Sequence, residues 1–213
     1  MCRKMVAFAG VLLLVTVSAF AQESSAGAGR VEISAFPGGG LFFTESNNGA
    51  QPDFASYALG GSCTVNANRW IGFEGELGGS IGIRQNLMFN NNALTDQKTP
   101  HMLGYSGNVV VSLAGSDRAV VPYATVGVGG LTMFDTTEVT NLGVARNETF
   151  LTGNLGGGVK WFSNRHWGVR ADYRFVTVKT NDTSPAFFGR PAVNDACECR
   201  YAHRVYGGLL LTY

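Results

Sequence analysis

Residues 204–213 read Arg-Val-Tyr-Gly-Gly-Leu-Leu-Leu-Thr-Tyr, and their side chains alternate between two faces of an extended chain. One row, which includes Arg204 and Thr212, is the more polar. Alternation with a period of two is typical of a β-strand with one apolar face, and a tilted strand of about 9–11 residues crosses a bilayer. The stretch therefore predicts a strand long enough to span a membrane. Its apolar row consists of Val205, Gly207, Leu209, Leu211 and Tyr213.

The other end of the sequence predicts export from the cytoplasm. Arg3 and Lys4 precede an apolar run at residues 11–15, and residues 19–21 read Ala-Phe-Ala. A basic start, an apolar run and a small-x-small site form the pattern of a secretory signal peptide. The apolar run is too short for a membrane-spanning helix. We expect cleavage after Ala21.

Composition excludes several classes of protein. The chain has 16 Lys and Arg and 15 Asp and Glu. Without Arg3 and Lys4 this leaves 14 basic and 15 acidic residues, a net charge of −1. Nucleic-acid binding depends on neutralising phosphates, so we expect no nucleic-acid partner. The 29 Gly, 14 Phe and 7 Tyr follow no collagen period and are too aromatic for low-complexity disorder. Many glycines and aromatic residues suit a curved β-barrel. After the signal peptide, the sequence shows no apolar period typical of a helix.

The rest of the chain divides into about eight segments with strand character, each long enough to cross a bilayer when tilted. They span approximately residues 30–43, 55–66, 70–83, 102–114, 119–134, 150–162, 167–178 and 200–213.

The connections between these segments alternate between short and long. The short ones are rich in turn-forming residues, and the long ones in Asn, Asp, Thr, Ser and Pro. Short periplasmic turns alternating with long extracellular loops are typical of bacterial outer-membrane barrels. The short connections are 66–69, 115–118 and 163–166, and the long ones are 44–54, 84–101, 135–149 and 181–199.

Alternation within the strands supports a barrel but leaves its polarity open. In residues 70–80, Phe73 and Leu77 share one face while Glu74 and Glu76 share the other. A soluble exported barrel would place the apolar row inside, and a membrane barrel would place the charges inside. The signal peptide, the last strand and the loop pattern together favour the membrane barrel.

Four stretches resemble the barrels related to outer membrane protein A. Residues 68–77 are similar to the second hairpin of that family, residues 121–129 to its fifth strand, and residues 157–162 with 167–174 to its penultimate hairpin. The resemblance implies an all-β, eight-stranded antiparallel up-and-down barrel in the outer membrane of a diderm bacterium. We expect residues 1–21 to be the signal peptide, 22–29 a short linker and 30–213 the barrel domain, without a C-terminal peptidoglycan-binding domain.

The same resemblance implies partners. The apolar row of the last strand would be read by the barrel assembly machinery, and periplasmic chaperones would carry the chain during biogenesis. Outer-membrane lipids and lipopolysaccharide would surround the folded barrel. The long loops, such as residues 85–92 and 185–191, would be the contact surface for a host or a phage, or simply exposed loops.

If the apolar rows face lipid, the charges of the strands point into the lumen. An eight-stranded barrel has an interior that side chains fill, and unpaired buried charges are costly. We expect an ionic network that plugs the lumen, or else pairs that switch partners and gate a pore. The network comprises Glu74, Glu76, Lys160, Arg170, Asp172, Arg174 and Arg204, with Glu32 and Arg200 nearer the rims.

Nothing in the sequence indicates catalysis or a metal site. No G-x-S-x-G motif is present, and the histidines lie at different heights of the predicted barrel, so they cannot complete a nucleophile site. The cysteines of the mature chain are too few for a zinc site, and Cys63 is expected at the end of the barrel opposite Cys197 and Cys199. The histidines are His101, His166 and His203.

We therefore expect a structural outer-membrane barrel that supports envelope integrity, with a mostly plugged polar lumen and no cofactor. A low-conductance porin-like channel for small solutes and a loop-mediated adhesion or recognition protein are the alternatives.

Overall fold

The computed structural model describes residues 29–44, 53–89, 92–115, 118–134, 147–179 and 199–213. The predicted signal peptide and most of the long loops lie outside these residues. No helix among the described residues is long and apolar enough to cross a membrane. The strands are β1 (Val31–Phe43), β2 (Phe54–Asn66), β3 (Ile71–Gly82), β4 (Arg84–Phe89), β5 (Asn92–Lys98), β6 (His101–Ser112), β7 (Val120–Phe134), β8 (Glu148–Phe162), β9 (Trp167–Lys179) and β10 (Cys199–Thr212).

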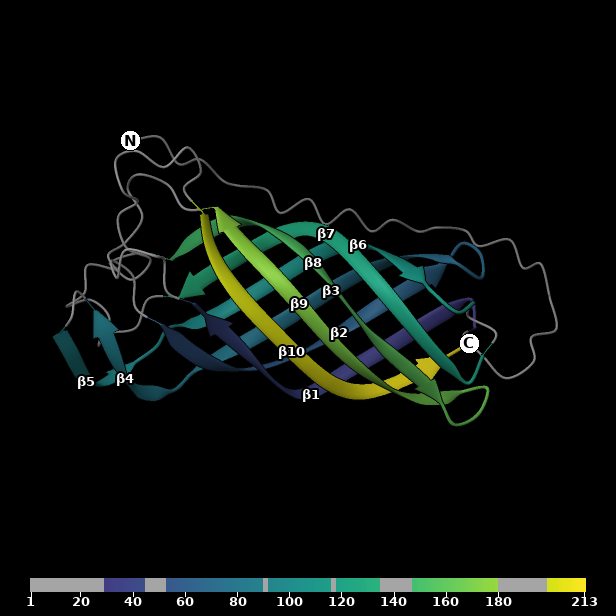
Figure 1. Ribbon diagram of the computed structural model, residues 1–213, viewed down its shortest axis with the longest axis horizontal. Helices are drawn as coiled ribbons and strands as arrows, with labels where there is room; N and C mark the ends of the chain where they lie inside the picture. The colour runs from purple at the N-terminus through teal and green to yellow at the C-terminus, as the bar shows by residue number, and fades with distance from the viewer. Residues whose placement is uncertain (1–28, 45–52, 90–91, 116–117, 135–146, 180–198) are drawn as a thin grey trace, which may run out of the picture.

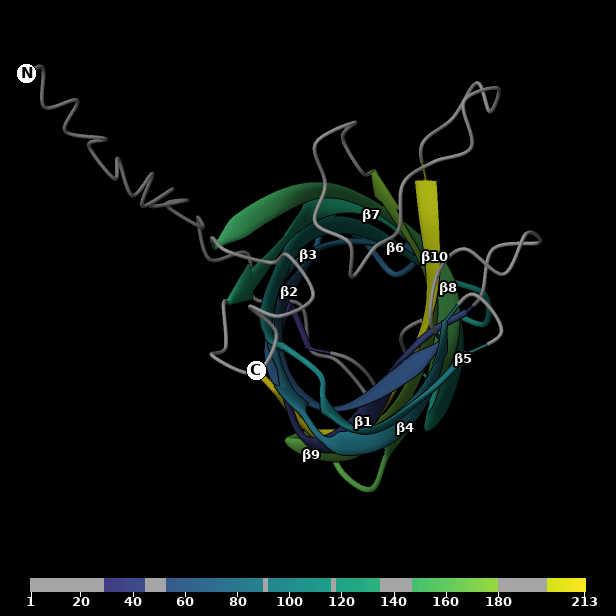
Figure 2. The same ribbon diagram turned by 90° about the vertical axis from the view of Figure 1, so that its left-hand side faces the viewer.

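Eight of these strands form one closed antiparallel barrel in the order β1-β10-β9-β8-β7-β6-β3-β2 (Figures 1 and 2). The first and last strands close it. The main-chain N–H of Val31 donates to the carbonyl of Tyr213 (3.0 Å), and that of Tyr213 donates to Val31 (2.9 Å). The eight-stranded barrel predicted from the sequence is confirmed, and each predicted strand boundary lies within two residues of the observed one.

The three short turns lie at one end of the barrel, together with the C-terminus (right in Figure 1). This is the periplasmic end. In the turn between β6 and β7, Gly115 adopts φ 69°, a left-handed conformation that glycine adopts without steric cost.

The long connection predicted over residues 84–101 is present, and within it β4 and β5 form a hairpin that the sequence did not reveal. The hairpin docks on the start of β2, where the side chain of Gln85 accepts from the N–H of Ala55 (3.0 Å) and donates to its carbonyl (2.7 Å). Leu87 of β4 is buried among the apolar side chains at the extracellular end of the barrel. The hairpin therefore helps to cover the extracellular mouth.

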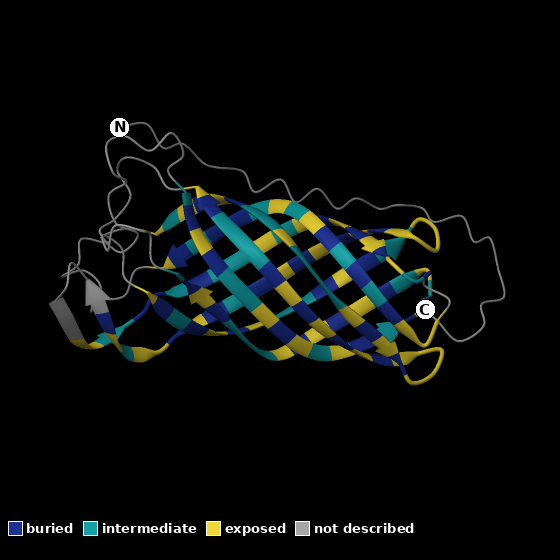
Figure 3. Ribbon diagram, viewed as in Figure 1, coloured by how far each residue is buried: buried dark blue, intermediate teal, exposed yellow. Residues whose placement is uncertain are grey.

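Exposed and buried residues alternate along the strands, as the bands in Figure 3 show. In β3, Phe73 is 58% and Leu77 57% exposed, whereas Glu74 is 3% and Glu76 6% exposed. The apolar side chains face outward and the charged ones face the lumen. This is the polarity of a membrane barrel and the reverse of a soluble one.

A β-bulge in β1 interrupts the alternation. Against β10, the register shifts by one residue between Ala35 and Gly38, and it also shifts against β2. Because one residue is added, the inward positions change from even to odd numbers. Phe36 faces inward before the bulge, and Leu41 and Phe43 face inward after it.

Candidate functional site

The lumen is crossed at mid-height by ion pairs between two opposite walls of the barrel. Glu74 projects from β3, and Arg170 and Arg174 project from β9. In the closed ring these two strands are separated by four steps in either direction, so they face each other across the diameter. One carboxylate oxygen of Glu74 lies 2.5 Å from Nη1 of Arg170, and the other lies 2.6 Å from Nη2 of Arg174.

Two more carboxylates complete this layer. Asp172 contacts Nη2 of Arg170 at 2.8 Å and Nε of Arg174 at 2.9 Å. Glu76 contacts Nη1 of Arg174 at 3.1 Å and Nη1 of Arg204, on β10, at 2.6 Å. Three carboxylates thus face three guanidinium groups, and the formal charge of the set is zero. We call these six side chains the ionic layer: Glu74, Glu76, Asp172, Arg170, Arg174 and Arg204.

Neutral side chains tie the ionic layer to the rest of the wall. Thr64 and Asn108 donate to the two oxygens of Glu74 at 3.2 and 3.1 Å. The hydroxyl of Tyr123 donates to Asp172 at 2.5 Å and accepts from Nε of Arg170 at 2.7 Å. Because a buried ion pair is favourable only when its remaining polar atoms are also satisfied, these contacts are part of what makes the layer stable.

A separate ion pair lies nearer the periplasmic end. Nζ of Lys160, on β8, is 2.6 Å from Glu32 on β1, and both side chains are almost fully buried. Asn66 donates to the other oxygen of Glu32 at 2.7 Å. At the extracellular end, Arg200 is buried and lies over the rings of Phe43 and Phe54. Glu32 and Arg200 therefore lie toward the two ends, as expected, but neither is exposed.

Apolar side chains fill the lumen on both sides of the ionic layer. A small cluster of Val121, Phe162 and Leu210 lies on the periplasmic side. A larger cluster on the extracellular side receives Leu87 from the β4–β5 hairpin. This cluster was not predicted from the sequence, and its members are Phe36, Leu41, Phe43, Phe54, Ala58, Leu87, Met102, Leu131, Met133, Phe150, Val178, Ala202 and Tyr206.

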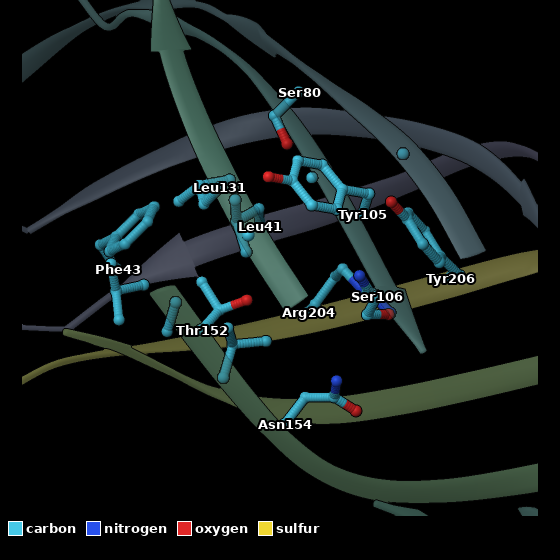
Figure 4. Close-up of a pocket in the computed structure, with 16 residues that line it drawn as sticks. Leu41, Phe43, Ser80, Tyr105, Ser106, Leu131, Thr152, Asn154, Arg204 and Tyr206 are labelled. Carbon is cyan, nitrogen blue, oxygen red and sulfur yellow. The ribbon is translucent and has the colours of Figure 1, made fainter. Parts of the chain in front are cut away.

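A cavity of about 40 Å³ lies between the ionic layer and the extracellular apolar cluster. Figure 4 shows Phe43 and Leu131 on one side of it and Arg204 and Ser106 on the other. Two guanidinium nitrogens of Arg204, Nε and Nη2, make no hydrogen bond within the described protein. Since one water needs about 10–15 Å³ by this measure, the cavity has room for a few waters and not for a larger solute.

The structure places the predicted lumen residues together. Six of them form the ionic layer, and Lys160 pairs separately with Glu32. Tyr123, Asn108 and Thr64 were missed. The sequence signal that could have found them is their inward register, since each shares the parity of its strand's buried positions.

The predicted assembly row of the last strand faces outward. Val205 is 46%, Leu209 52% and Tyr213 69% exposed. Gly207 is also on this face, and Leu211 is half-buried.

The histidines and cysteines are dispersed. His203 faces outward, and its Nδ1 lies 2.7 Å from the hydroxyl of Tyr173. His166 is exposed in the β8–β9 turn, and His101 begins β6. Cys63 is exposed near the periplasmic end of β2, and Cys199 begins β10 at the other end. Among the described residues, no group of three or more His, Cys, Asp or Glu is placed to hold a metal ion.

Comparison with known proteins identifies the architecture. The family model described as "Outer membrane protein beta-barrel domain" matches residues 7–189. No curated protein sequence matches significantly. Among solved structures, Neisserial surface protein A (NspA) aligns with a TM-score of 0.58 at 11% identity, covering 88% of this chain and 99% of its own. The N-terminal barrel of Pseudomonas aeruginosa OprF aligns with a TM-score of 0.49 at 13% identity and the same coverage.

Proposed function

The chain belongs to the outer membrane protein β-barrel domain family, and on that premise we propose that it is a structural protein of the outer membrane that supports envelope integrity with a closed lumen. Its location in the bacterial outer membrane follows from the family and the fold.

One observation carries the proposal: the ionic layer bridges β3 and β9 across the full diameter of the barrel. Arg174 is fully buried, and Glu74 is 3% exposed. Apolar clusters lie on both sides of the layer. A hydrated ion passing through would have to separate buried, hydrogen-bonded charges, which costs several kcal/mol. A lumen sealed in this way supports a mechanical role better than a transport role.

The test is single-channel recording with the refolded protein in a planar bilayer, after a heat-dependent shift in gel migration has shown that it is folded. We expect the folded wild type to add no discrete openings. Discrete openings whose amplitude or frequency changes in Glu74→Ala and Arg174→Ala would overturn the structural assignment. The exposed pair Arg84–Asp96 supplies the control, because Asp96→Asn changes a charge outside the lumen and Asn tolerates the positive φ of this residue.

A low-conductance channel for small solutes is the second candidate. Glu76 is shared between Arg174 and Arg204, and Arg204 has unpaired nitrogens beside the small cavity. The shared carboxylate and the adjacent cavity would allow Arg204 to change its ion-pair partner, and such an exchange is what a gate requires. Openings altered in the variants of the ionic layer would assign this role. Adhesion through the long loops stays a prediction, because three of the four long connections lie mostly outside the described residues.

We also propose that the outward row of β10, ending in Tyr213, is the segment that the assembly machinery reads during biogenesis. Tyr213 is 69% exposed, yet its main chain is paired with Val31, so its side chain is accessible where the barrel closes. We expect Tyr213→Ala to lower the amount of folded protein in outer-membrane fractions while the purified variant still refolds in detergent. Leu210→Ala, at an inward position, is the comparison. A purified Tyr213→Ala that no longer refolds would assign the residue to stability instead.

A further inference from the structure

The periplasmic end of the barrel combines exposed arginines with outward-facing tryptophans. Each of the three short turns contributes one exposed arginine. All three tryptophans of the chain lie at this same end, each between 43% and 57% exposed. The arginines are Arg69, Arg118 and Arg165, and the tryptophans are Trp70, Trp161 and Trp167.

Two of the turns are built in the same way. Oδ1 of Asn68 accepts hydrogen bonds from the main-chain N–H groups of Trp70 and Ile71 at 2.8 and 2.9 Å. Oδ1 of Asn164 accepts from the residues two and three positions later, both at 2.9 Å. In both turns an arginine follows the asparagine directly and a tryptophan starts or precedes the next strand. Each of these turns thus brings an arginine within two residues of a tryptophan in the sequence.

At the first of these turns the two side chains are also in contact. The guanidinium carbon of Arg69 lies 5.2 Å from the centre of the Trp70 ring. On the other side of the barrel, Trp161 and Trp167 lie on neighbouring strands that are joined by the turn holding Arg165. Trp161 also pairs with Val120, which follows Arg118 by two residues. Each arginine therefore lies within two residues of a tryptophan, or of a residue that pairs with one.

The exposed charges at this end are all positive among the described side chains. Among the described residues, its exposed charged side chains are arginines, with Arg30 as a fourth, and the nearby acid Glu32 is buried against Lys160. Asp117, which precedes Arg118 in the sequence, lies outside the described residues. At the extracellular end the described charges are mixed: Asp53, Asp96 and Glu148 with Arg84, Lys98 and Lys179.

We propose that these arginine–tryptophan pairs bind the headgroups of anionic glycerophospholipids in the inner leaflet of the outer membrane. Tryptophan takes the headgroup level of a membrane, with its ring in the interface. A guanidinium at that level can donate two parallel hydrogen bonds to a phosphate, and a basic group near an anionic lipid surface is attracted to it. The inference concerns the outside of the barrel and does not depend on what the lumen does.

The tryptophans supply the readout, because all of them lie at the end under test. The full mature chain would be refolded into vesicles of phosphatidylcholine mixed with phosphatidylglycerol, with either one lipid or the other brominated. Bromine quenches tryptophan fluorescence on contact, so the two series give the relative binding constant of the anionic lipid. We expect the wild type to prefer phosphatidylglycerol by about fivefold, the effect of one basic residue near an anionic surface. The preference should fall at 1 M salt, where the screening length is about 3 Å.

The variant Arg69→Gln/Arg118→Gln/Arg165→Gln keeps Arg30 and should lose most of the preference. A matched control, Arg84→Gln/Lys179→Gln, removes two basic residues at the extracellular end and should keep the preference. A wild-type ratio near one, or a preference that survives undiminished in the triple variant, would overturn the proposal. If the ratio is near one and the wild type, but not the triple variant, pellets with purified peptidoglycan, the surface belongs to the cell wall instead.

Discussion

Glu74→Gln is expected to destabilise the folded barrel by about 3–5 kcal/mol, the cost of removing one partner from a buried ion pair. The substitution keeps the size of the side chain but removes the charge that faces both Arg170 and Arg174. Since the site is only 3% exposed, water cannot replace the lost carboxylate. The measurement is equilibrium unfolding by urea in phospholipid vesicles, followed by tryptophan fluorescence.

Two further variants isolate the cause. Asp96→Asn removes the carboxylate that pairs with Arg84. The side chain of Asp96 is 73% exposed and that of Arg84 is 52% exposed, so the substitution should cost no more than about 1 kcal/mol. Asn also tolerates the positive φ of Asp96. Glu74→Gln/Arg170→Met leaves two carboxylates facing two guanidinium groups, and it should be more stable than Glu74→Gln alone. A cost for Glu74→Gln no larger than that for Asp96→Asn would contradict the view that the ionic layer is a stabilising element.

Val128→Arg is expected to destabilise the barrel by about 2–4 kcal/mol, the cost of a basic side chain on the lipid face at the bilayer midplane. Val128 lies near the middle of β7 and is 69% exposed. Its cross-strand neighbours are Gly107 and Gly153, and neither is crowded on its outer side. The longer side chain would therefore meet no protein atoms at these positions, and only its transfer into hydrocarbon would be costly.

Val120→Arg provides the depth control. Val120 begins the same strand at the periplasmic end and is 51% exposed. There the expected cost is about 0–1 kcal/mol, because the side chain can reach the interface. Unfolding of both variants in vesicles would be compared with unfolding of the wild type. If both substitutions cost equally little, the exposed apolar face does not lie in hydrocarbon.

The sequence predicted the barrel well because its signals are local. Alternation, turn residues and strand length are read within about a dozen residues, and they placed all eight barrel strands. Alternation alone left open which row faces the lumen, and the signal peptide, the last strand and the loop pattern placed the charged residues inside. The pattern of short and long connections then set which end faces the periplasm.

Three features depend on longer-range geometry and could not be predicted. The β4–β5 hairpin lies in a polar, Asn-rich stretch without clear alternation, so its sequence carries no strand signal. The bulge in β1 reverses the inward parity, which directs Leu41 and Phe43 into the lumen. The choice of ion-pair partners depends on the stagger of strands around the closed ring, which no single strand contains.

The ionic layer also bears on the lifetime of the folded protein. Glu74 and Arg170 are 96 residues apart in the chain, and Glu32 and Lys160 are 128 apart. No hairpin can bring such partners together, and β3 faces β9 only once β1 has met β10. The pairs that cross the lumen therefore form last, whereas the pairs of Asp172 with Arg170 and Arg174 lie within one strand. Interactions that form after the transition state slow unfolding and leave the folding rate nearly unchanged. The ion pairs across this lumen thus slow the unfolding of the assembled barrel without speeding its assembly.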